Sequence, residues 1–310
     1  MYYKSIINAE SQYIYHGAAL TTTVSGAVWN AASGSVSGAL AVGGSIETSL
    51  SNGTDDYAYT AGEISAAYDE FADSENTDVD FILMGGGGRP TSEVKALASE
   101  NISVAEIRQD AIAFVSPSRS SLITDTVGSA TVNTSSAITE NLKSFYSPIQ
   151  SSSYAVFDSG YKYMYDRFTD TFRYVPLNGD IAGTCARNDT TNFPWFSPAG
   201  TSRGAILNAV KLAYNPSKLQ RDRLYSARIN PVIFSPGAGI ILYGDKTGLA
   251  KASAFDRINV RRLFIFLESA ISAAAKDVMF EFNDALTRNS FVNAVDPFVR
   301  DVQEKRRIKD

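Results

Sequence analysis

Apolar residues recur at helical and strand spacings between residues 61 and 150, and the two patterns alternate. Helical spacing predicts helices over 61–72, 91–100 and 136–149, and compact apolar runs predict buried strands over 79–85 and 111–117. Thr91 is the expected N-cap of the second helix. The residues expected to face the core from these helices are Ile64, Ala67, Tyr68, Phe71, Val94, Leu97, Ala98, Ile138, Leu142 and Phe145.

Aromatic residues become frequent after Pro148, and the apolar pattern changes with them. Near-alternation over 153–179 predicts strands and turns. Residues 206–214 suit a short helix, because Pro216 disfavours helical backbone just before it. Pro236-Gly237 can form the corners of a type II turn, which predicts a hairpin between the apolar runs on either side.

Two further helices are predicted near the C-terminus. The first, over 258–282, carries an apolar stripe that we expect to face the core. This stripe comprises Val260, Leu263, Phe264, Leu267, Ile271 and Val278. The second contains Phe291, Val295, Phe298 and Val302 at helical spacing, and we expect an interruption at Asp296-Pro297.

These elements predict a two-domain chain of class α/β plus α+β. Helices alternating with buried strands are typical of an α/β layer domain, which we assign to residues 1–150. An aromatic-rich α+β core domain follows over 151–310, so the predicted boundary lies near Gln150. The first 48 residues are rich in Ser, Gly, Ala and Thr and show no repeat.

The composition narrows the classes of protein that this chain can belong to. Its 310 residues are 44% hydrophobic, which is enough for a buried core. A net charge of −5 argues against nucleic-acid binding, and the basic run of Lys305, Arg306, Arg307 and Lys309 is interpreted as a solvated helix end. The single cysteine excludes an internal disulfide. No signal peptide or membrane-spanning run is recognised, so we expect a soluble protein of a reducing compartment.

One glycine-rich loop is the main candidate for a catalytic or binding site in this sequence. Gly85–Gly88 follows a predicted strand and precedes a helix, which is where phosphate can bind, but the lysine and hydroxyl of a phosphate-binding loop are missing. His16 is the only histidine, and it is not beside a nucleophile motif. Cys185 is interpreted as a buried structural thiol. We therefore expect no catalytic, cofactor-binding or metal-binding residue.

Two further sequence signals are weaker. Asp73, Glu75, Asp78 and Asp80 cluster, but a calcium loop would also need its glycine and closing glutamate, so a solvated acidic loop is favoured. Two glycosylation sequons, one beginning at Asn52 and the other at 101, mean little without a signal peptide.

The sequence FPWFSPAG, residues 193–200, packs three aromatic residues and two prolines into eight positions. Prolines fix backbone angles and aromatic rings bury large areas, so this stretch predicts a stiff, anchored loop with Trp195 buried. Its neighbours Arg187, Asp189 and Arg203 can either line a pocket or form a set of ion pairs.

The stretch YAVFDSGYKYMYDRFTDTFRYVPLNGDIAGTCARNDTTNFPWFSPAG, residues 154–200, resembles the signature region of contractile phage tail sheath proteins of the T-even-like branch. The resemblance rests on an aromatic hairpin and a P-x-x-G-x-x-A-G helix, followed by a Pro-Trp-x-x-Pro-Ala-Gly loop. These motifs correspond to Pro176, Gly179, Ala182, Gly183, Pro194, Trp195, Pro198, Ala199 and Gly200. FDRINVRRLFIFLE, residues 255–268, continues the resemblance, which covers about 49–303.

The resemblance implies a structural subunit of a helical sheath that contracts and drives an inner tube through a host envelope. Implied partners are copies of itself, the tail tube protein, and the baseplate and tail terminator proteins, with no nucleic acid, membrane, cofactor or catalysis. The implied location is the virion, after assembly in the host cytoplasm. Subunits of this family are usually longer at both ends, so a fragment that stays monomeric is expected.

Two other functions remain open at the level of sequence. One is an α/β enzyme that holds a phosphorylated ligand at Gly85–Gly88, and the other is a host-contact module of the virion that uses the Ser/Thr-rich N-terminal part.

Overall fold

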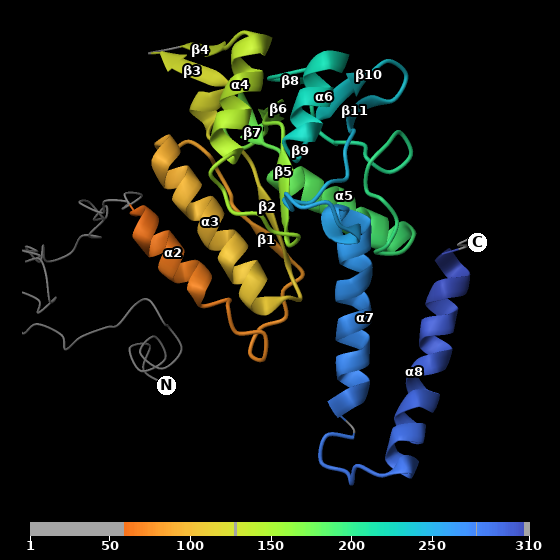
Figure 1. The fold of residues 1–310 in the computed structure, drawn as a ribbon. Coiled ribbons are helices and arrows are strands. Elements are labelled where there is room, and N and C mark those ends of the chain that lie inside the picture. The colour runs from red at the N-terminus through yellow and green to blue at the C-terminus, as the bar shows by residue number, and fades with distance from the viewer. Residues whose placement is uncertain (1–58, 127–128, 277, 307–310) are drawn as a thin grey trace, which may run out of the picture. The chain divides into compact units, whose positions relative to one another are not determined.

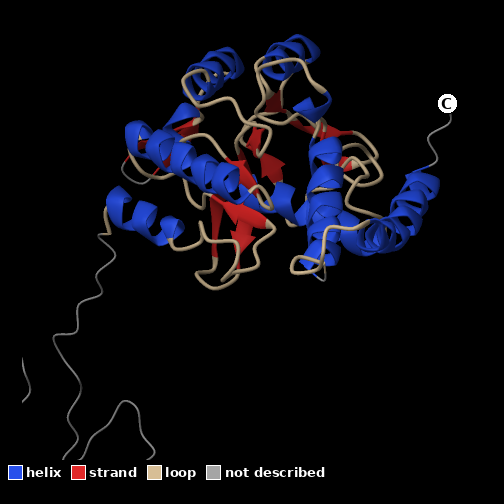
Figure 2. Ribbon diagram, turned by 60° about the horizontal axis from the view of Figure 1, so that its bottom comes forward, coloured by secondary structure: helices blue, strands red, loops and turns tan. Residues whose placement is uncertain are grey.

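A computed structural model describes residues 59–126, 129–276 and 278–306 of the chain, and these residues belong to one unit. A four-stranded parallel sheet of order β1-β2-β5-β9 lies at its centre. The sheet strands are β1 (Phe81–Leu83), β2 (Ile112–Val115), β5 (Ala155–Asp158) and β9 (Ile229–Asn230). Figure 2 shows helices on both sides of these strands.

Most of the remaining elements lie around this sheet, and α7 and α8 extend away from it (Figure 1). The α-helices are α2 (Ala61–Asp69), α3 (Thr91–Arg108), α4 (Ser135–Tyr146), α5 (Asn178–Thr191), α6 (Lys218–Ser226), α7 (Ile258–Lys276) and α8 (Ala285–Arg306). Short 3₁₀ turns span Arg119–Ser121 and Ala254–Asp256. The other strands are β3 (Ile123–Thr126), β4 (Ser129–Val132), β6 (Tyr161–Asp166), β7 (Thr171–Pro176), β8 (Lys211–Leu212), β10 (Val232–Ser235) and β11 (Gly239–Leu242).

The two faces of the sheet bury two separate cores, because successive strand residues point to opposite faces. Ala113 and Val115 of β2 belong to the core that α3, α4 and α6 cover. Ile112 and Phe114 of the same strand belong to the core that α5 covers. The result is a three-layer α/β/α body, which confirms the helix and strand assignments over 79–85, 111–117 and 136–149.

The sheet crosses the predicted domain boundary near Gln150. β5 lies beyond that boundary, yet its backbone pairs with β2 from Ala113↔Ala155 to Val115↔Phe157. β9 then pairs with β5. The aromatic-rich second half therefore completes the sheet that the first half begins, and Gln150 lies between two strands of one layer.

Several predicted helix limits differ from the structure. α2 begins with a capping box formed by Thr60 and Glu63, and it ends at Asp69 rather than at residue 72. α3 runs to Arg108 and ends on Gln109 in the left-handed region, with φ of 62°. The N-cap of α3 is Pro90 rather than Thr91, because the Thr91 hydroxyl lies 3.1 and 3.0 Å from the hydroxyls of two serines in the next loop.

The helix predicted over 206–214 is wrong. Its backbone groups are used in contacts between distant strands: the Ile206 N–H donates to Ile240 at 2.9 Å, and the Val210 N–H donates to Tyr163 at 2.8 Å. Asn208 adopts φ of 51°, which a continuing right-handed helix does not allow. Pairing with β6 and the neighbourhood of β11 therefore override the local helical pattern.

The hairpin at Pro236-Gly237 is confirmed. β10 and β11 pair in antiparallel register, Ser235 accepts a hydrogen bond from the Ala238 N–H at 3.1 Å, and Gly237 has φ of 84°. A positive φ at the third position of the turn is the reason that glycine occurs there.

Most of the apolar stripe predicted on the long helix does not face the core, so this part of the prediction is wrong. α7 contacts the body only through its first turns, where Ile258 and Leu263 are buried together with Arg261 and Arg262. It then runs away from the layers, and α8 returns beside it (Figure 1). α8 is continuous through Pro297, although the sequence predicts an interruption there, and Asp296 and Arg300 form an exposed ion pair of 2.8 Å across the proline.

Candidate functional site

Parallel α/β sheets usually bind ligands beyond the carboxyl ends of their strands, where Gly85–Gly88 follows β1. In this structure the loop packs against the segment that follows β2 and against the start of β6. A Cβ atom on Gly87 would lie 2.2 Å from the Tyr161 hydroxyl and 2.8 Å from the Pro117 carbonyl oxygen. The Gly87 carbonyl accepts a hydrogen bond from the Arg119 N–H at 2.8 Å. The glycines therefore allow a close approach of the backbone to the neighbouring loop, and the phosphorylated-ligand alternative finds no support.

An open hollow of about 480 Å³ lies at this loop, and Gly85, Gly86, Lys162 and Asp180 are among the residues that line it. The Lys162 ammonium donates to the Asp180 carboxylate at 2.8 Å and to the Leu207 carbonyl at 2.9 Å. Its charge is therefore already compensated, and it is not free to hold an anion.

The carboxyl end of β5 carries a buried acid, Asp158. Its Oδ2 accepts a hydrogen bond from the Ser116 hydroxyl at 2.5 Å, and its Oδ1 accepts one from the Gly160 N–H at 2.8 Å. The Ser116 hydroxyl in turn accepts the Asn178 N–H at the start of α5, at 2.9 Å. Burial raises the pKa of Asp158 to about 8, against the lowering effect of these two hydrogen bonds. The group joins β2, β5 and α5 and has no opening to solvent, so it is structural.

Among the other candidate residues, Cys185, Asn101 and the acidic loop at Asp73 lie in different parts of the described fold. Cys185 is fully buried in α5, and burial raises its pKa to about 11, as expected for an unreactive thiol. Asn101 is buried within α3, so its sequon is not on the surface. In the acidic loop, the Asp73 carboxylate accepts a hydrogen bond from the Glu75 N–H, and the Asp73 carbonyl accepts one from the Thr77 hydroxyl. No group of three or more acidic, histidine or cysteine side chains that could hold a metal ion occurs among the described residues. His16 and Asn52 lie outside those residues.

FPWFSPAG forms the anchored loop that its composition predicts. Trp195 is 5% exposed and stacks on Phe193 at 4.8 Å with an interplanar angle of 3°. It also lies 5.4 Å from the Phe266 ring of α7, and Phe266 lies 5.7 Å from the Phe298 ring of α8. The loop thus packs against both helices that leave the body, through an aromatic cluster separate from the two main cores.

The charged neighbours of this loop do not form one set of ion pairs. Arg187 donates to the carbonyl oxygens of Arg203 and Ala205, at 3.0 and 2.7 Å. Asp189 pairs instead with Arg262 of α7, at 2.5 Å. The sequence search missed Arg262 because it lies 73 residues from Asp189 in the chain.

Two consecutive arginines hold the start of α7 against the body. The Arg261 guanidinium donates to the Ser153 hydroxyl at 2.7 Å and lies 4.2 Å from the centre of the Tyr154 ring. Arg262 lies over the Phe81 ring at 5.3 Å and pairs with Asp189. A pair of arginines inside an apolar helical run is the signal that could have identified this attachment, because buried arginines need partners of this kind.

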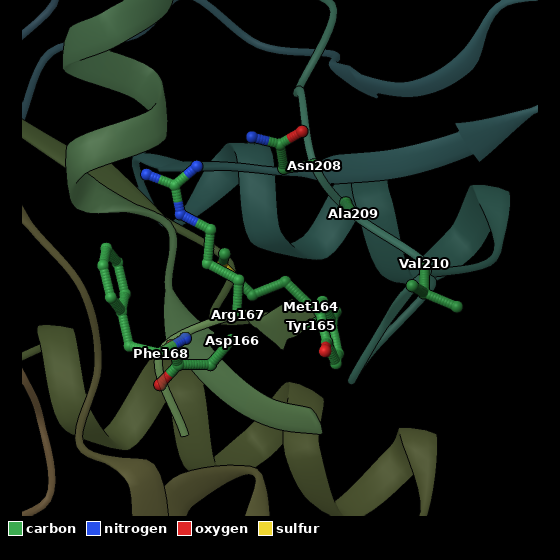
Figure 3. Close-up of a pocket in the computed structure, with 8 residues that line it drawn as sticks. All are labelled: Met164, Tyr165, Asp166, Arg167, Phe168, Asn208, Ala209 and Val210. Carbon is green, nitrogen blue, oxygen red and sulfur yellow. The ribbon is translucent and has the colours of Figure 1, made fainter. Parts of the chain in front are cut away.

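A surface hollow of about 790 Å³ lies between the β6–β7 hairpin and the segment before β8 (Figure 3). Met164, Tyr165, Asp166, Arg167 and Phe168 line it from the hairpin. Asn208, Ala209 and Val210 line it from the other segment. Its walls carry exposed apolar side chains and no cluster of catalytic groups, which is typical of a contact surface rather than of an active site.

None of the helices within 59–126, 129–276 and 278–306 is both long and apolar enough to span a membrane.

Comparisons with known proteins place this chain beside one family. A family model described as the phage tail sheath protein central domain matches residues 57–248. The tail sheath protein of Vibrio phage KVP40 is 45% identical over 213 residues, which cover 65% of this chain and 31% of that protein. The tail sheath protein of Enterobacteria phage T4 is 42% identical over 239 residues, covering 75% and 36%. The matched part of the chain spans about a third of the length of these relatives.

Two solved assemblies contain chains of similar fold. One is the baseplate of the anti-feeding prophage, with a TM-score of 0.57 at 17% identity, covering 79% of this chain and 58% of that one. The other is the helical sheath of the same system in its contracted state, with a TM-score of 0.55 at 16% identity, covering 82% and 61%.

Proposed function

Because this chain belongs to the phage tail sheath protein family, we propose that it is part of a structural subunit of a contractile tail sheath. In this function the subunits polymerise helically around a tail tube and shift from an extended to a contracted lattice, which drives the tube through the host envelope. The observation that carries the proposal is the family match over residues 57–248, which spans the whole three-layer body.

The architecture supports a function based on shape. A subunit that changes its contacts with neighbours has to keep its own interior fixed, and two well-packed cores on the faces of one sheet provide that rigidity. The α7–α8 hairpin leaves this body and is attached by the Arg261–Arg262 pair and by the Trp195 cluster. We infer that the body and the hairpin present separate contact surfaces to different neighbours.

The partners follow from the same proposal. Copies of the subunit form the sheath, the tail tube lies inside it, and the baseplate and the tail terminator bound its two ends. The subunit is a component of the virion, assembled in the host cytoplasm, and it acts without a catalytic group or cofactor. A heterologous contact that does not close on itself generates a helical assembly of this kind.

Polymerisation around tail tubes tests the proposal. The chain, alone and joined to the flanking segments of its longer relatives, is mixed with purified tubes and baseplates and examined by negative-stain electron microscopy. We expect the extended chain to form sheathed tubes with a helical repeat and the chain alone to stay monomeric, and an antibody raised against residues 59–306 should decorate the sheathed tubes. Tubes that stay bare, while the subunit remains in the soluble fraction under every condition, would remove the sheath function.

A further inference from the structure

The described part of the chain leaves one side of α2 uncovered. The helix packs along α3, yet none of its nine residues is buried. A helix this short is not stable by itself in water, so its stability has to come from packing. The uncovered side therefore carries apolar groups for which the described residues supply no cover.

An apolar hollow of about 390 Å³ lies on this uncovered side. Ile64, Ala67 and Tyr68 of α2 line it, together with Tyr59 and Phe71 just beyond the two ends of the helix. Tyr59 is 55% exposed and Phe71 is 45% exposed. Because Ala67 is much smaller than the side chains around it, one apolar side chain of a partner can enter the hollow at this position.

The surroundings of the hollow are acidic. Glu63 lines it, and Glu70 directly follows the helix. Neither carboxylate forms an ion pair in the described part of the chain, and residues 59–88 contain no lysine or arginine. Arg89, the first cation after this stretch, is already paired with Glu93 at 3.1 Å. A partner of this hollow should therefore bring an apolar side chain flanked by cations.

The exposed face of α6 has this character. Its outward residues recur at helical spacing and are Lys218, Leu219, Asp222, Arg223 and Ser226. Lys218 forms no ion pair among the described residues. Arg223 lies 3.4 Å from Glu140, and both of these side chains are more than half exposed, so their pairing is weak. With Asp222 counted, the face has an excess of positive charge around one apolar side chain, Leu219.

Other exposed apolar side chains fit an acidic hollow less well. Phe280 and Phe282 are more exposed than Leu219, but Glu281 lies between them. The hairpin tip around Phe168 carries as many aspartates as arginines. On α8, two exposed cations are paired with aspartates of the same helix. Like charges that face each other oppose binding, so α6 matches the hollow in both charge and shape.

We propose that the hollow on α2 binds α6 of a second copy, with Leu219 seated at Ala67 and the two helices antiparallel. Arg223 then lies opposite Glu63, because four residues span about 6 Å along either helix. Antiparallel helices also place the positive amino end of one beside the negative carboxyl end of the other. The inference rests on the proposed function only in taking a second copy as the partner.

The two faces belong to different copies. Within one chain α2 lies beside α3 and α6 lies beside α4, so the faces stay apart (Figure 1). Because the contact joins two different surfaces, it propagates head to tail. A single pair of short helices buries less than the roughly 1,200 Å² of a stable complex, so free chains should meet only transiently.

Disulfide trapping accumulates such transient pairs and tests the contact. Ala67→Cys and Leu219→Cys chains are mixed under mild oxidation, and the control mixture contains Val210→Cys in place of Leu219→Cys. Leu219 and Val210 are both 65% exposed, and the native Cys185 is buried, so it should not compete. We expect heterodimers to form at least about tenfold faster than in the control, because contact raises the local thiol concentration. Equal rates, or Ala67→Cys homodimers that form faster than the heterodimers, would overturn the proposal.

Residues 1–58 of the same chain are the alternative occupant of the hollow. In dilute protein, the Ala67→Cys thiol should react with a maleimide within a few-fold of the rate of the Val210→Cys thiol. Labelling that is tenfold slower would show that the chain covers its own hollow, and it would overturn the proposal.

Charge reversal gives an independent criterion in the trapping assay. In the antiparallel contact Lys218 lies near Glu70, so Lys218→Glu in the Leu219→Cys chain should slow trapping several-fold. Glu70→Lys in the Ala67→Cys chain should restore the rate. Both changes suit the helix dipoles, since they add an acid at the start of α6 and a base at the end of α2. Lys211→Glu on β8 makes the same change of charge elsewhere and should have no effect. If Glu70→Lys does not restore the rate, the pairing is refuted.

Electron microscopy of the extended chain with the same cysteines separates this inference from the proposed function. Sheathed tubes that form while trapping stays at the control rate would refute the contact and leave the sheath function standing. Specific trapping and charge rescue without any sheathed tubes would support the contact and count against the sheath function.

Discussion

Replacing Trp195 by alanine should weaken the attachment of the α7–α8 hairpin more than any other single change in the FPWFSPAG loop. The indole is 5% exposed and touches rings from the loop and from α7. An aromatic residue buries roughly 150–250 Å², which at about 25 cal/mol per Å² sets an upper limit near 4–6 kcal/mol. Truncations of buried tryptophan cost about 3–5 kcal/mol, because the remaining cavity closes only in part.

The assay is thermal unfolding combined with limited proteolysis. For a unit of this size, 3–5 kcal/mol corresponds to a melting temperature lower by about 6–20 °C. If the hairpin detaches before the body unfolds, cleavage in the α7–α8 connection should increase while the body stays intact. Trp195→Phe serves as the matched control, since it keeps an aromatic ring and the buried indole N–H has no hydrogen-bond partner in the described part of the chain to lose.

Fluorescence adds a direct measure of burial. The chain has two tryptophans, so Trp29→Phe leaves Trp195 as the only indole. Its emission should be blue-shifted in the native protein and should move to longer wavelength on unfolding. A Trp195→Ala protein with the wild-type melting temperature and the wild-type cleavage pattern would refute the reasoning that this loop anchors the hairpin.

Three further predictions concern the carboxyl ends of the sheet strands. Gly87→Ala should lower the free energy of unfolding by about 1–3 kcal/mol, because its Cβ would overlap a tyrosine hydroxyl. Gly88→Ala has open space around it and should change the free energy of unfolding by less than about 1 kcal/mol. Urea unfolding of the two variants measures both values. Calorimetry should detect no micromolar binding of ATP, GTP or NAD at Gly85–Gly88, and binding would revive an enzymatic function. The folded pKa of Asp158, about 8, lies above its unfolded value, so its stabilising contribution is complete below pH about 4 and is lost as the pH rises to 8. Asp158→Asn should remove this loss of stability between pH 5 and 8, whereas the surface variant Asp170→Asn should retain it. Equal slopes of unfolding free energy against pH for the two variants would contradict the raised pKa of Asp158.

The sequence predicted best those elements whose apolar pattern and contacts are both local. α4 buries the predicted Ile138, Leu142 and Phe145, and the turn at Pro236-Gly237 forms because two adjacent residues determine its geometry. Each of these elements can be assigned without knowing which distant segment packs against it.

The wrong predictions share a dependence on distant partners. Residues 206–214 carry a helical pattern, but β6 and β11 supply strand partners that no local window contains. The stripe on α7 predicted burial, yet the body covers only the first turns, where Arg261 and Arg262 find a serine and an aspartate far away in the chain. The boundary near Gln150 followed a change in composition, whereas a sheet is defined by pairing, and β2 and β5 pair across it.

The distribution of polar and apolar groups separates what must stay fixed from what must bind. Inside the body, buried polar groups such as Asp158 and Ser116 are hydrogen-bonded across several elements, which favours one packing over its alternatives. On the surface, the largest exposed apolar side chains gather at two loops that project from it, with Phe168 on one and Phe280 and Phe282 on the other. Exposed aromatic residues weaken solubility, so their concentration at these two loops favours a role for both loops in contacts with other molecules.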